Sequence, residues 1–283
     1  MPPITLSKQR RAGIFANPDY GASLELAATN QPVERLLGSA DLRGLRGLKL
    51  GPLPGAEKEA RMLEEKSAKL GLGLAVLRVG KSATKSELNA LESPYVLHLA
   101  THGFLLPEWG SAGAQGTNVG EGTRLQSKFQ LNPMHRSGLA MAGAQQTFEA
   151  WDKGQTVPPE NDGIVTAEEV GGLNLRGTWL VVLSACDTGL GEARAGEGVL
   201  GLRRGFVQAG ARNLLLTLWP IDDEQTGKII IDFYTEASRT GDAPRAMAEV
   251  QREWLDKLRK EKGLLESCRI AGPFILSFQG EAQ

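Results

Sequence analysis

The chain has 283 residues, and its 32 basic and 33 acidic side chains leave a formal net charge of −1. Charges of both signs are interspersed, so neither a nucleic acid nor an anionic membrane surface is an expected partner. No apolar run approaches the roughly 20 residues that span a bilayer, and the first residues lack the apolar core of a secretion signal. Two cysteines and three histidines, widely spaced, predict neither a disulfide framework nor a metal site. We therefore expect a cytoplasmic protein without a cofactor.

Apolar runs of strand length alternate with segments of helical periodicity along the chain. Strands are predicted, in chain order, at residues 12–16, 74–79, 95–100, 179–185, 213–219 and 274–278, with a further small strand at 139–144. Helices are predicted at 56–70, 82–91, 197–209, 223–238 and 242–260, and another helix starts at Thr166 after a turn at 162–163. This alternation is typical of an α/β fold with a mostly parallel sheet and helices on both faces.

The segment at residues 110–122 is rich in small and polar side chains and nearly free of large apolar ones. It buries too little apolar surface to offset the entropy of ordering. We therefore expect a flexible insertion at about residues 107–137 within a single domain of residues 1–283. Loops of this kind are preferred sites of proteolysis. Three basic residues near the predicted active site make self-cleavage a hypothesis: Arg124, Lys128 and Arg136.

Cys186 ends the apolar run at 179–185 and is followed by Asp187 and a turn that contains glycine. A lone cysteine in an apolar strand is most often an inert core residue, and this is our interpretation of Cys268. Cys186 differs because the chain must turn there, at the carboxyl end of a predicted parallel strand. Ligands and reactive groups gather at such strand ends. Cys186 is therefore the candidate nucleophile.

One histidine lies within the strand predicted at 95–100 and another lies just after it. His98 falls inside the apolar run, which predicts a buried core side chain, whereas His102 stands at the exit. An imidazole beside a thiol raises the thiolate fraction and carries a proton to the leaving amine. The pattern therefore predicts a catalytic dyad of Cys186 and His102. The backbone N–H groups of Gly103 and Cys186 are the predicted oxyanion hole.

Several segments in fixed order resemble a CHAT domain, a family of caspase-like proteins related to separase and often attached to tetratricopeptide repeats. They are Thr101-His-Gly103, Ser184-Ala-Cys-Asp-Thr188, Gly196-Glu-Gly-Val199, Ala209-Gly-Ala211 and Leu218-Trp-Pro-Ile-Asp222. The resemblance implies a caspase-like three-layer α/β/α fold with a mostly parallel central sheet. It also implies a cysteine endopeptidase with His102 and Cys186 as catalytic residues, acting on a protein or peptide in a bacterial regulatory or defence pathway. The sequence lacks the helical repeats, so a regulatory or helical-repeat protein is an expected partner.

The resemblance also bears on the substrate, because relatives of the separase and clostripain kind cleave after arginine or lysine and carry an acid in the specificity pocket. Four acids near predicted strand ends are candidates for binding a basic side chain through charge-assisted hydrogen bonds: Asp19, Asp187, Asp222 and Asp223. For each of them the alternative is a solvated loop carboxylate or a helix cap. Cleavage after aspartate would instead need a pocket arginine, and the sequence identifies none.

Two other classes of protein stay open. The glycine-rich segment 189–198 follows a predicted strand and precedes a helix, the setting in which phosphates bind. It lacks the Gly-Lys-Ser/Thr ending of a phosphate loop, and its two glutamates would repel phosphate. A caspase-like fold can also serve as a non-catalytic scaffold that binds protein partners, because fold does not dictate function. An ordinary thiol titration of Cys186 would favour the scaffold.

Overall fold

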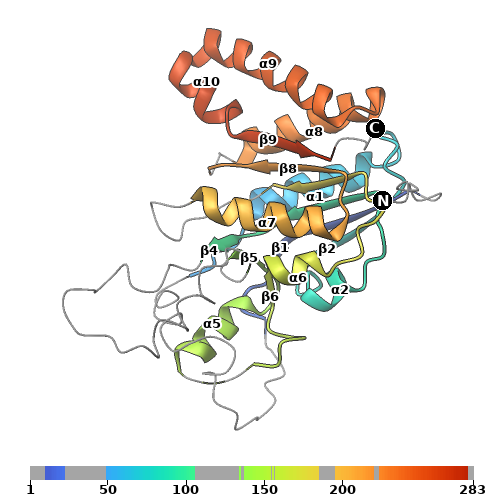
Figure 1. The fold of residues 1–283 in the computed structure, drawn as a ribbon. Helices are drawn as coiled ribbons and strands as arrows, with labels where there is room; N and C mark the ends of the chain where they lie inside the picture. The colour runs from blue at the N-terminus through green and yellow to red at the C-terminus, as the bar shows by residue number, and fades with distance from the viewer. Residues whose placement is uncertain are drawn as a thin grey trace, which may run out of the picture.

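The structure, a computed structural model, describes residues 10–22, 49–105, 134, 137–153, 155, 157–184, 195–219 and 223–279. Its main feature is a six-stranded sheet in the order β2-β1-β3-β7-β8-β9 (Figure 1). The strands are β1 (Arg11–Pro18), β2 (Leu74–Gly80), β3 (Val96–Ala100), β7 (Leu180–Leu183), β8 (Asn213–Thr217) and β9 (Phe274–Phe278). All neighbouring strands pair in parallel except β8 and β9, which are antiparallel. The carboxyl ends of the five parallel strands therefore share one edge.

Alternate side chains of each strand face two different layers of helices. In β3, Val96 and Ala100 belong to one apolar cluster, whereas Leu97 and Leu99 belong to another. This is the two-residue period of an extended strand that is buried on both faces. The first cluster is covered by α1 (Pro54–Lys66), α8 (Asp223–Thr240), α9 (Ala243–Lys262) and α10 (Leu264–Ala271). The second is covered by α2 (Lys85–Asn89), α6 (Ala167–Gly171) and α7 (Ala195–Ala209) (Figure 1). The expected three-layer α/β/α fold is confirmed.

A second, smaller sheet lies beyond the carboxyl end of β3. It is antiparallel and has the order β4-β5-β6, with β4 (Gly103–Leu105), β5 (Ser137–Ala140) and β6 (Ile164–Thr166). The helix α5 (Ala144–Asp152) packs beside it through Phe148, which meets Phe104 edge to face. Tyr20, just after β1, belongs to the same apolar cluster. The small sheet thus adjoins the strand ends where the site is expected.

The expected strands of the large sheet and the five expected helices are confirmed, with shifted ends, and so is the helix expected to start at Thr166. The strand expected at 139–144 is wrong in extent: β5 ends at Ala140, and Gly143 turns the chain with a positive φ of 88° so that α5 begins at Ala144. The sequence missed four elements: β4, β6, α5 and α10. The expected insertion at about 107–137 lies outside the described residues, apart from Met134 and Ser137, and the single domain of residues 1–283 stays a prediction.

No described helix combines the length and the apolar composition needed to cross a membrane. Likewise, the described part of the chain contains no group of three or more His, Cys, Asp or Glu side chains arranged to hold a metal ion.

Candidate active site

The two strands expected to carry the catalytic residues are direct neighbours. β3 and β7 pair in parallel, with Leu99 opposite Leu183, and the Ser184 N–H donates to the Leu99 carbonyl at 2.9 Å. His102 lies three residues after Leu99, and Cys186 lies three residues after Leu183 in the sequence. The pairing register therefore brings the residues that lead from β3 to His102 and the described residues that lead from β7 toward Cys186 to the same edge of the sheet. Cys186 itself lies outside the described residues.

The imidazole of His102 is held on two sides. Its side chain is buried, with a tilted ring contact to Tyr20 at a centroid distance of 5.1 Å. Its Nε2 lies 2.7 Å from the carbonyl oxygen of Gly51, in the segment that leads into α1. A carbonyl only accepts, so the ring must donate from Nε2. In the neutral ring this bond places the proton on Nε2 and the lone pair on Nδ1.

The backbone around His102 is fixed by a chain of hydrogen bonds. The His102 N–H donates to the Tyr20 hydroxyl at 3.3 Å, and the Tyr20 and Thr101 hydroxyl oxygens are 3.0 Å apart. Thr101 donates to the carbonyl oxygen of Ala140, so Tyr20 is the donor to Thr101. Burial raises the pKa of Tyr20 to about 12, which keeps this donor protonated at neutral pH. The Ala140 N–H returns to the His102 carbonyl at 2.9 Å.

Gly103, the expected oxyanion-hole residue, follows His102 directly and begins β4. A Cβ added at Gly103 would meet only the Gly138 carbonyl oxygen, at 3.8 Å, which is an ordinary contact. No described atom therefore crowds this position. The other expected donor, the backbone N–H of Cys186, lies outside the described residues, and the oxyanion hole stays a prediction.

The four expected substrate-binding acids are described only in part. Asp19 lies after β1 and is half-buried, and its Oδ1 accepts from the Gly21 N–H at 3.2 Å. Its carboxylate thus closes a turn, which is the structural role weighed against pocket binding. Asp223 is the first residue of α8, but its side chain lies outside the description, as do Asp187 and Asp222.

Of the expectations for His98 and Cys268, one is confirmed and the other is wrong. The expectation that His98 is a core residue is confirmed, because the side chain is fully buried in β3. The core interpretation of Cys268 is wrong, because this thiol is exposed on α10. The residues that α10 buries are Ser267, Ile270 and Ala271. Helical periodicity therefore turns Cys268 to solvent.

Sequence reasoning missed three residues that shape the site. Tyr20 and Gly51 carry no signal in the sequence, since one is a lone aromatic after a strand and the other acts through its backbone. Glu59 did leave a signal: it lies on the helical face of α1 that is otherwise apolar, with Ala56, Ala60 and Leu63. A carboxylate at a buried position of this kind needs polar partners.

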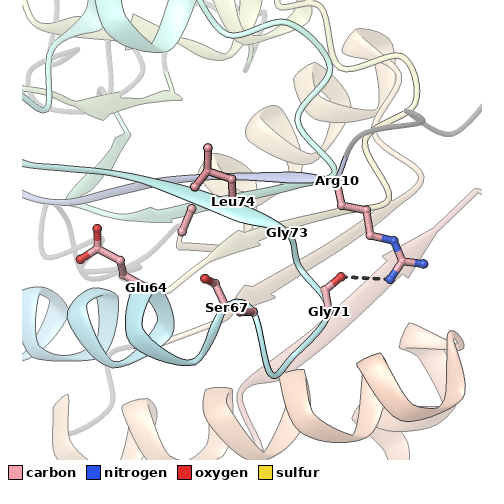
Figure 2. Close-up of a pocket in the computed structure, with 8 residues that line it drawn as sticks. Arg10, Glu64, Ser67, Gly71, Gly73 and Leu74 are labelled. Atoms are coloured by element: carbon pink, nitrogen blue, oxygen red, sulfur yellow. Dashed lines mark hydrogen bonds between the residues drawn. The ribbon is translucent and has the colours of Figure 1, made fainter.

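A pocket of about 630 Å³ opens at the opposite edge of the sheet (Figure 2). It is lined by residues from the end of α1 and the start of β2, and at its rim Arg10 donates to the Gly71 carbonyl at 2.9 Å. Arg11 pairs with Leu74 there, at the amino ends of β1 and β2. His102 follows the carboxyl end of β3, which is parallel to both. This pocket is therefore separate from the candidate active site.

A mostly parallel sheet between two helix layers, with a histidine directly after the strand next to that of the expected nucleophile, defines a caspase-like α/β domain. The family model of the CHAT domain matches residues 4–270. The chain therefore belongs to the CHAT domain family, a caspase-like peptidase family.

Two curated relatives extend this assignment. The chain is 28% identical over 253 residues to human Tetratricopeptide repeat protein 28, covering 88% of this chain and 9% of the relative. It is 30% identical over 186 residues to the mouse protein of that name, covering 65% of this chain and 7% of the relative. The chain thus spans less than a tenth of the length of either relative.

Proposed function

We propose that the protein is a cysteine endopeptidase in which Cys186 is the nucleophile and His102 the proton carrier. The observation that carries the proposal is the pairing of β3 with β7, with Leu99 opposite Leu183. It brings the approaches to His102 and Cys186 to adjacent strand ends, where catalytic groups of parallel sheets gather. Membership of the CHAT domain family supports the same reaction class.

In the proposed reaction, His102 takes the proton of the Cys186 thiol, and the thiolate attacks the carbonyl carbon of the scissile bond. The Gly51 carbonyl supports this role, because its hydrogen bond to Nε2–H makes Nδ1 the basic nitrogen of the neutral ring. The oxyanion accepts hydrogen bonds from the backbone N–H groups of Gly103 and Cys186. When the C–N bond breaks, His102 returns the proton to the leaving amine. Water then hydrolyses the thioester, with His102 as base.

The proposed substrate is a protein or peptide cleaved after arginine or lysine. A carboxylate in the pocket would select these side chains through charge-assisted hydrogen bonds. Asp19, Asp187, Asp222 and Asp223 are the proposed acids. Asp19 lies just beyond β1, whose Ala16 pairs with Ala100 at the end of β3. The name of the two relatives supports a further proposal, that a helical-repeat protein presents substrates to this domain or regulates it in the cytoplasm.

A fluorogenic peptide panel with arginine, lysine, aspartate or leucine at the cleavage position tests the proposal. We expect hydrolysis of the arginine and lysine peptides, and its loss in Cys186→Ala and His102→Ala. Cys268→Ala is the matched control, because it removes the other thiol, which is exposed on α10. Activity that survives in Cys186→Ala would refute the assignment of the nucleophile. A wild type without activity, in which Cys186 reacts with iodoacetamide as an ordinary thiol, would favour the non-catalytic scaffold.

A further inference from the structure

Glu59 is a carboxylate buried beneath the sheet. It lies on α1 with an exposed fraction of 3%, on the face that packs into the apolar cluster. Removing a carboxylate from water is costly unless hydrogen bonds and opposite charges replace the solvent. The proposed reaction does not use Glu59, so its partners indicate what it does.

Two side chains contact Glu59 directly, and a third contacts one of these two. The Ser184 hydroxyl oxygen, at the end of β7, is 2.7 Å from both carboxylate oxygens. His98 of β3 brings Nε2 to 3.1 Å from Oε1, close enough for an ion pair but outside hydrogen-bond geometry. On the other side of that ring, Nδ1 lies 3.2 Å from the hydroxyl of Tyr234 on α8. We call these four residues, Glu59, His98, Ser184 and Tyr234, the Glu59 cluster.

The Glu59 cluster keeps the tyrosine protonated. Burial, with the nearby charge of Glu59, raises the pKa of Tyr234 well above its usual value. A hydroxyl that keeps its proton can either donate to Nδ1 of His98 or accept from it, so Tyr234 stays a neutral partner of the ring. The strongest contacts of the carboxylate remain those with Ser184. The cluster therefore fixes Ser184, which follows β7 and lies two positions before Cys186 in the sequence.

The same stretch of chain also holds the other strand end. Gly51, in the lead-in to α1, accepts from the His102 ring. The start of α1 is in turn tied to β1, because Asn17 accepts from the Leu53 N–H at 2.7 Å and donates to Glu57 at 3.0 Å. Residues 51–59 thus contact both His102, the expected proton carrier, and Ser184, which leads to the expected nucleophile.

We infer that Glu59 is a positioning residue: through Ser184 it fixes the approach to Cys186 relative to His102, with residues 51–59 as the common support. This inference rests on the proposed function. Ser184→Ala and Glu59→Gln each alter the contact with little change in volume. Because a displacement of about 1 Å costs up to roughly 100-fold in rate, we expect kcat to fall by 10- to 100-fold while KM changes little.

A readout independent of peptide cleavage is the alkylation of Cys186 by iodoacetamide, followed by mass spectrometry. The exposed Cys268 serves as an internal reference. We expect the ratio of Cys186 to Cys268 alkylation, and its dependence on pH, to change in both variants. Since both substitutions act through one contact, kcat of the double variant should fall no further than kcat of the more impaired single variant. Glu65→Gln is the matched control, because Glu65 is an exposed carboxylate on the same helix.

Folded variants with wild-type kcat and a wild-type alkylation ratio would overturn the inference, even if their melting temperatures fall, since that pattern marks a purely structural role. If the wild type cleaves no peptide, the alkylation ratio alone decides, which separates failure of this inference from failure of the proposed function. If Glu59→Gln does not fold, Ser184→Ala decides in the same way.

Discussion

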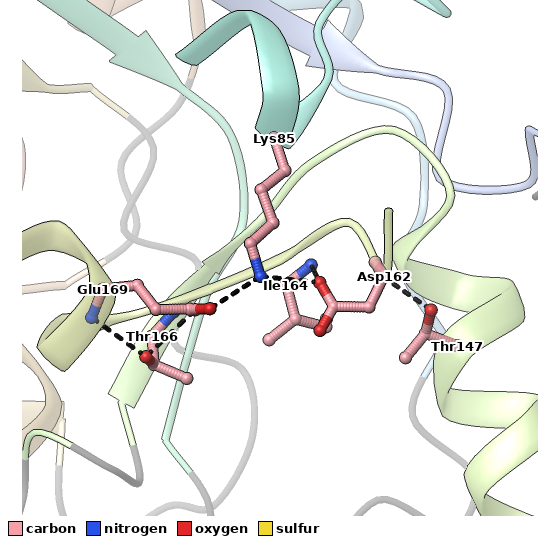
Figure 3. A network of polar contacts seen from close by, with 6 residues as sticks. All are labelled: Lys85, Thr147, Asp162, Ile164, Thr166 and Glu169. Carbon is pink, nitrogen blue, oxygen red and sulfur yellow. Dashed lines mark hydrogen bonds and ion pairs between the residues drawn. The ribbon is translucent and has the colours of Figure 1, made fainter. Parts of the chain in front are cut away.

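Two buried polar clusters in the described part of the chain differ in where their partners lie. The Glu59 cluster joins α1 and α8 to the middle of β3 and to Ser184, the residue after β7. The second, which we call the Lys85 cluster, consists of Lys85, Asp162 and Glu169 (Figure 3). The Lys85 Nζ lies 3.0 Å from Asp162 Oδ1 and 2.7 Å from Glu169 Oε1, and the lysine side chain is only 4% exposed.

The Lys85 cluster joins two helices to the segment that leads into β6. Lys85 lies on α2, Asp162 precedes β6 and Glu169 lies on α6. Asp162 also accepts from the Ile164 N–H at 2.8 Å, and its carbonyl accepts from the Thr147 hydroxyl of α5 at 2.6 Å. None of these contacts involves a residue that follows β3 or β7. Similar burial therefore serves stability in the Lys85 cluster and, by our inference, the placement of reactive groups in the Glu59 cluster.

The largest expected effect is on stability. Lys85→Met keeps an unbranched side chain one atom shorter but leaves Asp162 buried without its cation, and breaking a buried ion pair costs about 3–5 kcal/mol. We expect the free energy of unfolding to fall by this amount in urea denaturation. Lys81→Met, at an exposed lysine four residues earlier, is the control. In the folded fraction the alkylation ratio of Cys186 should stay as in wild type. A changed ratio would remove the distinction between the two clusters.

The next effect is a dependence of stability on pH. Burial raises the pKa of Asp162 from 3.8 to about 6, although Lys85 opposes this rise. The folded state therefore holds a proton that the unfolded state has already lost. The contribution to stability is present below pH 3.8 and is lost as pH rises through about 6. It amounts to at most about 3 kcal/mol.

Urea denaturation of wild type and Asp162→Asn at several pH values measures this contribution, because asparagine does not titrate. We expect the difference between the two unfolding free energies to change between pH 4 and 6 and to be constant above pH 7. A difference that is flat over the whole range would contradict the raised pKa of Asp162.

The smallest effect concerns the cap of α6. The Thr166 hydroxyl accepts from the Glu169 N–H at 3.2 Å, and the Glu169 carboxylate accepts from the Thr166 N–H at 2.8 Å. Thr166→Ala removes one half of this capping box, which costs about 1 kcal/mol. Thr235→Ala, at an exposed position within α8, should change stability by less than about 0.5 kcal/mol. Equal losses in the two variants would show that the cap contributes nothing specific.

The large sheet was predictable because its central strands β3, β7 and β8 are buried and leave continuous apolar runs. The small sheet was not, since β4 and β6 have three residues each, too few to display a period. The direction of β9 also escaped prediction, because an apolar run carries no information about the strand beside which it lies. α10 was missed because only Gly263 separates it from α9.

The candidate site was predictable where chemistry accompanies a strand end, as at His102. The residues that hold the site in place could not be predicted. Gly51 acts through a carbonyl that every residue carries, and Tyr20 reaches Thr101 across 81 positions of sequence. Glu59 interrupts an apolar helical face, and only the structure reveals that Ser184 and His98 meet it there. Pairings between distant segments depend on the fold, so a pattern of residue types cannot specify them.

The hydrogen bonds that run from His102 through Tyr20 and Thr101 to Ala140 return from the Ala140 amide to the His102 carbonyl. They form a closed circuit in which each hydroxyl gives one proton and receives another. No single member can reverse its direction without leaving a neighbour unsatisfied. Local unfolding here must therefore release the end of β3 and the small sheet together. The imidazole of His102 is thus anchored to a unit larger than its own loop.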